Sequence, residues 1–160
     1  MSEKIIKALT PLLQRVRRDA TALKPVGKQS FWAKDKLTTA MMTKHVTGGD
    51  QRGCCPINAG ESTTRCAVLD FDSHGGETPW EEMQAVAEKV SARLEQAGCH
   101  PLMFRSSGGR GVHLIMLWED EQDAASVRAH LRSVIGGLGL KDGTAGVVNG
   151  EVEVFPKQDS

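Results

Sequence analysis

The stretch Cys66-Ala67-Val68-Leu69-Asp70-Phe71-Asp72 is an apolar run that ends in two carboxylates separated by one residue. An uninterrupted apolar run of this length is typical of a strand buried on both faces. Positions i and i+2 of a strand project from the same side, so Asp70 and Asp72 are expected to point together. Two adjacent carboxylates repel each other, and a bound divalent cation is the usual relief. The alternative is that the strand ends at Asp70 and that Asp72 is a solvated turn residue.

Length and composition favour one domain over residues 1–160, with 39% hydrophobic and 25% charged residues. The chain has neither an apolar run of about 18 residues nor a cleavable leader pattern, so we expect a cytoplasmic protein without a membrane partner. The four cysteines lack CxxC pairing, which favours buried, reduced thiols and argues against structural zinc.

The neutral net charge hides a strong asymmetry along the chain. Residues 1–52 carry eleven Lys or Arg against four acidic residues, a net charge of +7, and the remainder carries −7. A basic arm beside an acidic core is typical of polyanion binding next to a metal site. The alternative is that the basic residues form an ordinary solvated surface.

The N-terminal part, residues 1–52, is predicted to be largely helical. Hydrophobic periodicity favours an amphipathic helix over 3–18, with a kink or break near Thr10 because Pro11 follows. Residues 21–38 are expected to form a loop in which Phe31-Trp32 docks as an aromatic anchor. A short helix over 38–46 follows, and then a hairpin of 53–57 with 65–71 through the turn residues 58–62.

From residue 65 onward the predicted order is strand, helix, strand, strand, helix, strand. The elements are strands 65–71, 100–105, 112–118 and 151–155, a helix that begins with Thr78 as cap and Pro79 in its first turn and ends at Gly98, a helix over 121–135, and a loop over 141–150. This order favours an α+β fold with a ferredoxin-like or RRM-like β-α-β-β-α-β core over residues 65–156. Its first and third strands lie adjacent at the centre, and its fourth strand flanks the first. Asp70, Asp72, His113, Glu151 and Glu153 would therefore converge.

The turn from Arg105 to His113 is rich in glycine and in side chains that can contact an anion. Glycines let backbone amides approach a phosphate, and Ser107, Arg110 and His113 add donors, a set that suits a triphosphate. Hairpins also need glycine for backbone reasons alone, so the turn favours a phosphate site only beside the paired carboxylates.

Three segments together resemble the motifs of the archaeo-eukaryotic primase superfamily. They are Leu69-Asp70-Phe71-Asp72, Ser107-Gly108-Gly109-Arg110-Gly111-Val112-His113, and Glu153-Val154-Phe155-Pro156-Lys157-Gln158. They look like the family's D-x-D or D-x-E pair, its S-G-x-[K/R]-G-x-H turn, and its third strand with an acidic residue. The resemblance covers residues 45–158 and is greatest to primase-polymerases of phages, plasmids and mobile elements, and more distant to the polymerase domain of bacterial end-joining ligases.

The resemblance implies a role for each matched position. Asp70, Asp72 and Glu153 would be the catalytic carboxylates that hold two Mg²⁺ or Mn²⁺ ions, with Glu151 as the alternative to Glu153. The nucleotide triphosphate would be contacted by Ser107, Gly108, Arg110, Gly111 and His113. The implied activity is template-dependent nucleotidyl transfer, by primer extension or de novo priming, with a DNA template or primer and an NTP or dNTP as partners.

The sequence also departs from the family pattern. Residues 53–158 hold the predicted catalytic core, and the chain stops soon after the third motif, so it could be a fragment of a longer protein, with a helicase in cis or in trans. Without Tyr and with only three Trp, the chain has few aromatic platforms, and its template grip would come from the basic N-terminal part. The competing hypotheses are a non-catalytic nucleotide or single-strand binding module, and a plain ferredoxin-like scaffold with solvated acids.

Overall fold

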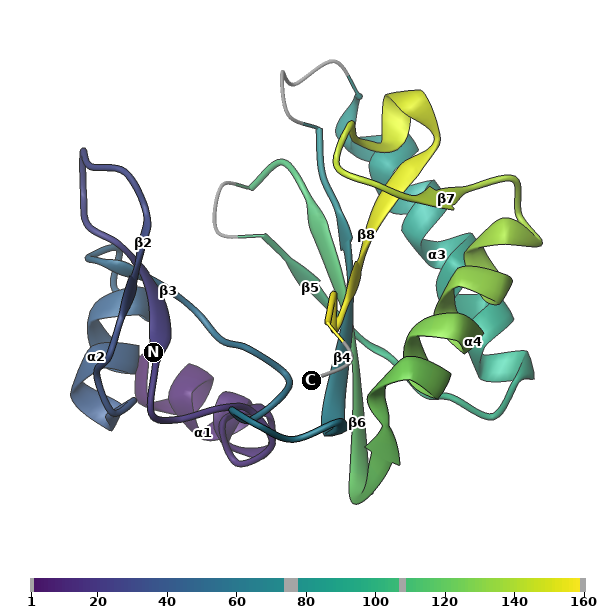
Figure 1. Cartoon of the computed structure of the whole chain (residues 1–160). Helices are drawn as coiled ribbons and strands as arrows, with labels where there is room; N and C mark the ends of the chain where they lie inside the picture. The colour runs from purple at the N-terminus through teal and green to yellow at the C-terminus, as the bar shows by residue number, and fades with distance from the viewer. Residues whose placement is uncertain (1, 74–77, 107–108, 159–160) are drawn as a thin grey trace.

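The structure, a computed structural model, describes residues 2–73, 78–106 and 109–158. It is an α+β fold built on a five-stranded sheet of order β5-β6-β4-β8-β7 (Figure 1). The strands are β4 (Thr63–Phe71), β5 (Leu102–Arg105), β6 (Val112–Asp123), β7 (Lys141–Asp142) and β8 (Glu151–Phe155). Strands β4 and β6 are central and adjacent, and β8 flanks β4, so the predicted β-α-β-β-α-β topology is confirmed.

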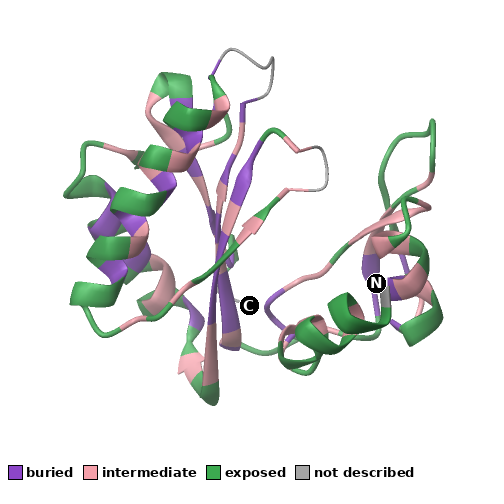
Figure 2. Cartoon of the chain, turned by 180° about the vertical axis from the view of Figure 1, so that it is seen from behind, coloured by how far each residue is buried: buried purple, intermediate pink, exposed green. Residues whose placement is uncertain are grey.

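Helices α3 (Trp80–Gln96) and α4 (Ala124–Gly136) cover one face of this sheet (Figure 1). Alternation along β4 sends Leu69 and Phe71 into the core beneath them, each fully buried. The same core contains Met83, Val90, Leu94, Leu114, Met116, Leu131, Ile135, Val152 and Val154. Figure 2 shows buried segments along the strands of this sheet and on parts of the two helices. Burial of apolar surface on this face stabilises the sheet register.

The other face of the sheet carries a smaller apolar cluster and the polar end of β4. Cys66 and Ile115 are buried there against Val16, which follows α1 (Ser2–Leu13). Burial raises the pKa of the Cys66 thiol to about 12, so this thiol is an inert core group. The predicted helix over residues 3–18 ends at Leu13, soon after Pro11, because proline removes a backbone donor from the helix.

The N-terminal part forms a second, three-stranded sheet where a loop and a hairpin with β4 were predicted. Its order is β2-β1-β3, with β1 (Thr21–Lys24), β2 (Phe31–Ala33) and β3 (Gln51–Gly53), and α2 (Thr39–Val46) connects β2 to β3. Strand β3 pairs with β1, and only an isolated bridge, Ile57 to Thr64, links the predicted hairpin. The prediction that Phe31 and Trp32 dock as an aromatic anchor is also wrong, because these side chains are 53% and 61% exposed.

Side chains cap two of the helices, and the cap predicted for the third is wrong. Thr38 caps α2 through its side chain, and Asp123 caps α4 by accepting from the Ser126 amide at 2.8 Å. Helix α4 therefore begins later than predicted, because β6 continues to Asp123 in pairing with the start of β4. At α3 the cap is Pro79, in extended geometry, and not Thr78. The predicted loop over 141–150 contains the short strand β7 and a 3-10 turn, η1 (Val147–Asn149).

Candidate active site

A row of polar side chains crosses three adjacent strands on the sheet face opposite α3 and α4. Asp70 on β4 lies directly opposite His113 on β6 and directly opposite Glu153 on β8. Paired residues of antiparallel strands project to the same face, about 4.5–5.5 Å apart at Cβ. The structure therefore brings together one predicted residue from each of the three sequence motifs.

Asp70 and His113 interact directly. The Nε2 atom of His113 lies 3.3 Å from Oδ1 of Asp70. The hydrogen bond with Asp70 raises the pKa of His113 above its ordinary value against the opposing effect of burial, and the charges of Asp70 and Asp72 act in the same direction. The contact with Asp70 thus holds the His113 ring within the row.

Asp72 lies just beyond the end of β4. Its Oδ1 accepts a hydrogen bond from the Ser73 amide at 2.6 Å, and its backbone carbonyl accepts from the amide of Val147 in η1 at 3.0 Å. The second carboxylate of the pair is thus positioned by backbone contacts at the strand end. Because β4 ends at Phe71 and Asp72 is half-buried just beyond it, this position fits both the metal-ligand and the turn-residue interpretations.

The two acids of β8 have different partners. Glu153, which faces Asp70, forms an ion pair with Lys157 in which Oε2 and Nζ are 2.6 Å apart. Glu151 accepts from the Ala145 amide at 2.7 Å and pairs with Nζ of Lys141 at 3.0 Å. The Ala145 hydrogen bond lowers the pKa of Glu151, with Lys141 acting in the same direction. Glu151 is therefore bound to the loop before η1, and Glu153 is the acid that belongs to the row.

The glycine-rich turn between β5 and β6 uses several of its donors internally. The Gly109 amide donates to the Ser106 carbonyl at 2.8 Å, and the Gly111 amide donates to Ser106 Oγ at 3.0 Å. A Cβ at Gly111 would lie 2.5 Å from the Phe71 carbonyl oxygen, so this glycine permits the close approach of β4. Arg110 is exposed, while Ser107 and Gly108 lie outside the described residues.

The side chains of the carboxylate row match a divalent-cation site in their chemical type but not in their spacing. Carboxylate oxygens are the ligands that Mg²⁺ and Mn²⁺ prefer, so Asp70, Asp72 and Glu153 fit such ions by donor type. Within the described ranges, however, no three His, Cys, Asp or Glu side chains lie close enough together to hold a metal ion. In the structure, Asp70 is paired with His113 and Glu153 is paired with Lys157, so each of these carboxylates has a basic side chain as its partner.

Two features of the site were not predicted from the sequence. The first is Lys157, whose ion pair depends on how the chain leaves β8. The second is Arg105, whose guanidinium lies 4.0 Å from the ring centroid of Trp80 at the start of α3 and donates through Nε to the Gly109 carbonyl. Both residues lie in segments that the sequence singled out, Lys157 in the third motif and Arg105 at the start of the glycine-rich turn, but their contacts were not predictable from the motifs.

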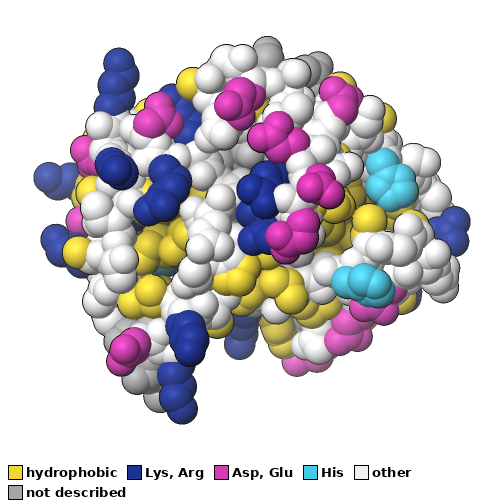
Figure 3. All heavy atoms as spheres, turned by 90° about the horizontal axis from the view of Figure 1, so that it is seen from below, with side chains coloured by type: hydrophobic (Ala, Val, Ile, Leu, Met, Phe, Trp, Pro, Cys, Tyr) yellow, Lys and Arg dark blue, Asp and Glu magenta, His cyan; other side chains and the backbone are white. Residues whose placement is uncertain are grey.

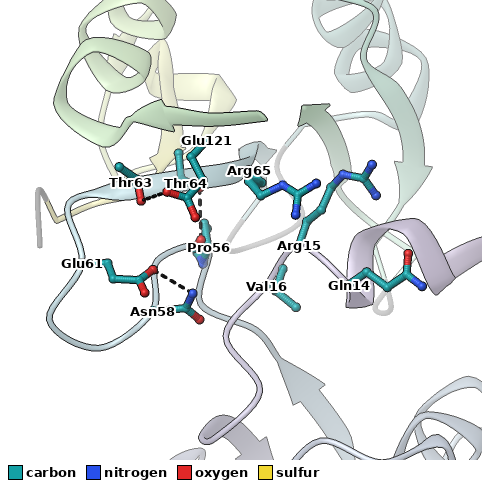
Figure 4. A pocket seen from close by; sticks show the side chains of 10 residues that line it. All are labelled: Gln14, Arg15, Val16, Pro56, Asn58, Glu61, Thr63, Thr64, Arg65 and Glu121. Carbon is teal, nitrogen blue, oxygen red and sulfur yellow. Dashed lines mark hydrogen bonds between the residues drawn. The ribbon is translucent and has the colours of Figure 1, made fainter. Parts of the chain in front are cut away.

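A small hollow of about 120 Å³ lies away from the row, at the beginning of β4 (Figure 4). Arg15 and Arg65 lie along one side of it, and the carboxylates of Glu61 and Glu121 lie across from them. Charges of both signs line the hollow, so it has no clear preference for an anion or a cation.

The charge asymmetry of the sequence is visible on the surface. Seen from below, Lys and Arg side chains gather over the N-terminal part, and Asp and Glu side chains are more frequent toward the middle and right (Figure 3). In the part of the chain that the structure describes, no helix is long and apolar enough to cross a membrane.

Fold and motif order together define a primase-polymerase type of domain. The model of the family "LigD, primase-polymerase domain" matches residues 22–142. The chain belongs to this family, and the predicted membership of the archaeo-eukaryotic primases is confirmed. Among solved structures, the polymerase domain of Mycobacterium tuberculosis Ligase D in complex with DNA is similar, with a TM-score of 0.63 and 15% identity over 100% of this chain and 72% of that one. No curated protein sequence matches.

Proposed function

We propose that the chain is a metal-dependent nucleotidyltransferase that adds NTPs or dNTPs to a primer, or makes primers de novo, on a nucleic-acid template. The observation that carries this proposal is the register of three strands, which sets Asp70 between His113 and Glu153. The family match agrees with the reaction class, and the similar mycobacterial domain is itself a complex with DNA.

The proposed function gives the carboxylates and the neighbouring basic side chains different roles. Asp70 and Asp72, with Glu153 opposite, would hold Mg²⁺ or Mn²⁺, which when bound supply activation of the attacking 3′ hydroxyl and charge neutralisation of the triphosphate. The Asp70 contact orients the His113 ring and favours its protonated form, which is a donor for a phosphate oxygen. Arg110 is exposed on the adjacent turn and is the predicted cationic contact for the same anion. Ser107, Gly108 and Gly111 remain predicted parts of the triphosphate site.

The N-terminal sheet supplies the features expected of a nucleic-acid contact. Phe31 and Trp32 on β2 are more than half exposed, although large aromatic side chains are normally buried. They lie within the basic segment of net charge +7, which includes Lys24, Lys28 and Lys34 nearby in sequence. Exposed aromatic rings beside lysines bind single strands by stacking on bases and attracting phosphates. The template would therefore contact β2.

The test is incorporation of labelled nucleotide on a primed template with Mn²⁺ or Mg²⁺. We expect wild-type protein to form product and Asp70→Asn with Asp72→Asn to abolish it. Asp120→Asn, an exposed acid on β6 outside the row, is the matched control and should keep wild-type activity. Undiminished product from the double variant would refute the site. Metal-dependent nucleotide binding without product in the wild type would instead support the non-catalytic binding module.

A further inference from the structure

Two acidic side chains face each other at the centre of the row, and each has its own basic neighbour. Asp70 and Glu153 are directly opposed across β4 and β8, where like charges destabilise a strand pair. His113 lies beside Asp70, and Lys157 lies beside Glu153. The structure thus pairs each of these two acids with a basic side chain of the chain itself.

Lys157 is anchored by its backbone while its side chain stays partly exposed. Its carbonyl accepts a hydrogen bond from Nη1 of Arg128 on α4 at 2.5 Å, which fixes the chain just after β8. The Lys157 side chain is 45% exposed, and its Nζ lies 5.0 Å from the ring centroid of Phe155. The aromatic ring offers the ammonium a contact that does not depend on Glu153. The side chain can therefore leave the carboxylate without any change in backbone position.

The ion pair between Lys157 and Glu153 differs from the ion pair that Lys141 forms with Glu151, the other acid of β8. Lys141 pairs with Glu151 at 3.0 Å, but the Glu151 carboxylate is also held by the Ala145 amide and does not face Asp70. No corresponding backbone donor to the Glu153 carboxylate is found among the described residues. An ion pair this exposed contributes little energy, so a divalent cation can displace the ammonium.

We propose that Lys157 is an exchangeable counter-ion of the candidate active site: its ammonium neutralises Glu153 when no divalent cation is bound and is displaced when one binds. The proposal rests on the proposed function, because it takes Glu153 as a ligand. It assigns Lys157 as a positioning residue that competes with the metal ion. It agrees with the finding that, among the described residues, no three His, Cys, Asp or Glu side chains are close enough to hold a metal ion.

The test measures the affinity of the full chain for Mn²⁺ alone, by electron paramagnetic resonance of the free ion. Lys157→Gln should bind Mn²⁺ about two- to fivefold more tightly than wild type, because an exposed ion pair no longer has to be broken. Lys157→Arg keeps the charge and should bind like wild type. Lys141→Gln removes the same net charge from the neighbouring pair and should leave the affinity unchanged. In a Glu153→Gln background, Lys157→Gln should have no further effect.

The outcomes separate this proposal from the proposed function. If Asp70→Asn with Asp72→Asn weakens Mn²⁺ binding while Lys157→Gln binds like wild type or more weakly, the counter-ion role is overturned and the metal site stands. If neither wild type nor Lys157→Gln binds Mn²⁺, both the counter-ion role and the proposed metal site are refuted. An equal gain in Lys157→Gln and Lys141→Gln would show a general charge effect and would also overturn the proposal. Circular dichroism of each variant verifies the fold.

Discussion

Replacing Gly111 with alanine should destabilise the whole fold, not only weaken nucleotide binding. The added Cβ would lie 2.5 Å from the Phe71 carbonyl oxygen and 3.2 Å from Ser106 Oγ. The first neighbour is backbone of the central strand β4, so it can move only if the pairing of Phe71 with Val112 opens. Overpacking of a well-packed region costs about 1–3 kcal/mol, and for a chain of this size 2 kcal/mol lowers the Tm by about 4–8 °C.

The assay is urea unfolding followed by circular dichroism, without metal or nucleotide, for wild type, Gly111→Ala and Gly136→Ala. Gly136 ends α4 and has open space around its Cβ position, so its replacement should be neutral or slightly stabilising. Wild-type stability of Gly111→Ala would refute the steric reasoning. Such a result would leave the close approach of a bound phosphate as the explanation for glycine at position 111.

Three further predictions concern single contacts. His113→Gln should lower the free energy of unfolding by roughly 0.5 kcal/mol at about pH 6 and by less at about pH 9. The pKa of His113 is raised in the folded state, so its ion pair with Asp70 stabilises the fold fully below about pH 6.5 and is lost as the pH rises through the folded-state pKa. Solvent screening of this partly exposed pair keeps the effect small. A larger loss at the higher pH would contradict the pairing. Thr78→Val should be neutral or stabilising by up to about 1 kcal/mol in thermal unfolding, because the buried Thr78 Oγ1 has no hydrogen-bond partner among the described residues. Thr64→Val should cost about 1–2 kcal/mol, because the Thr64 hydroxyl accepts from the Cys66 amide and donates to the carbonyl of Pro56 or Cys66. Equal effects of the two would sink that argument. Phe31→Ala with Trp32→Ala should weaken binding of a fluorescent single-stranded oligonucleotide by about 1–3 kcal/mol per stacked base, while Leu138→Ala, a change at another exposed apolar side chain, should not. Unchanged affinity of the double variant would remove β2 from the interface.

The central core followed closely from the sequence because its signals are local and repeated. The apolar run before Asp70 required a buried strand, and alternation placed Leu69 and Phe71 on the opposite side from Asp70. The helix between the first two strands carried its apolar stripe at helical spacing. With these elements fixed, few topologies remained, and the observed strand order is the predicted one.

The N-terminal part was predicted poorly for an equally physical reason. Strands β1, β2 and β3 have three or four residues each, too few to show a period of two. Which strand pairs with β3 depends on the contacts that surround it, not on the turn that follows it. The exposure of Phe31 and Trp32 likewise depends on which elements pack nearby.

The sequence by itself determined the parts of the candidate site: the carboxylate pair, the glycine-rich turn and a third acidic strand, in an order that only a few folds accommodate. Only the tertiary structure decided which acid of β8 joins Asp70, because strand register assigns Glu153 to the row and leaves Glu151 to the Ala145 loop. It also decided the counter-charge, since the path of the chain after Phe155 brings Lys157 to Glu153. Local patterns fix which side chains share a strand face, but pairing across strands depends on the whole sheet.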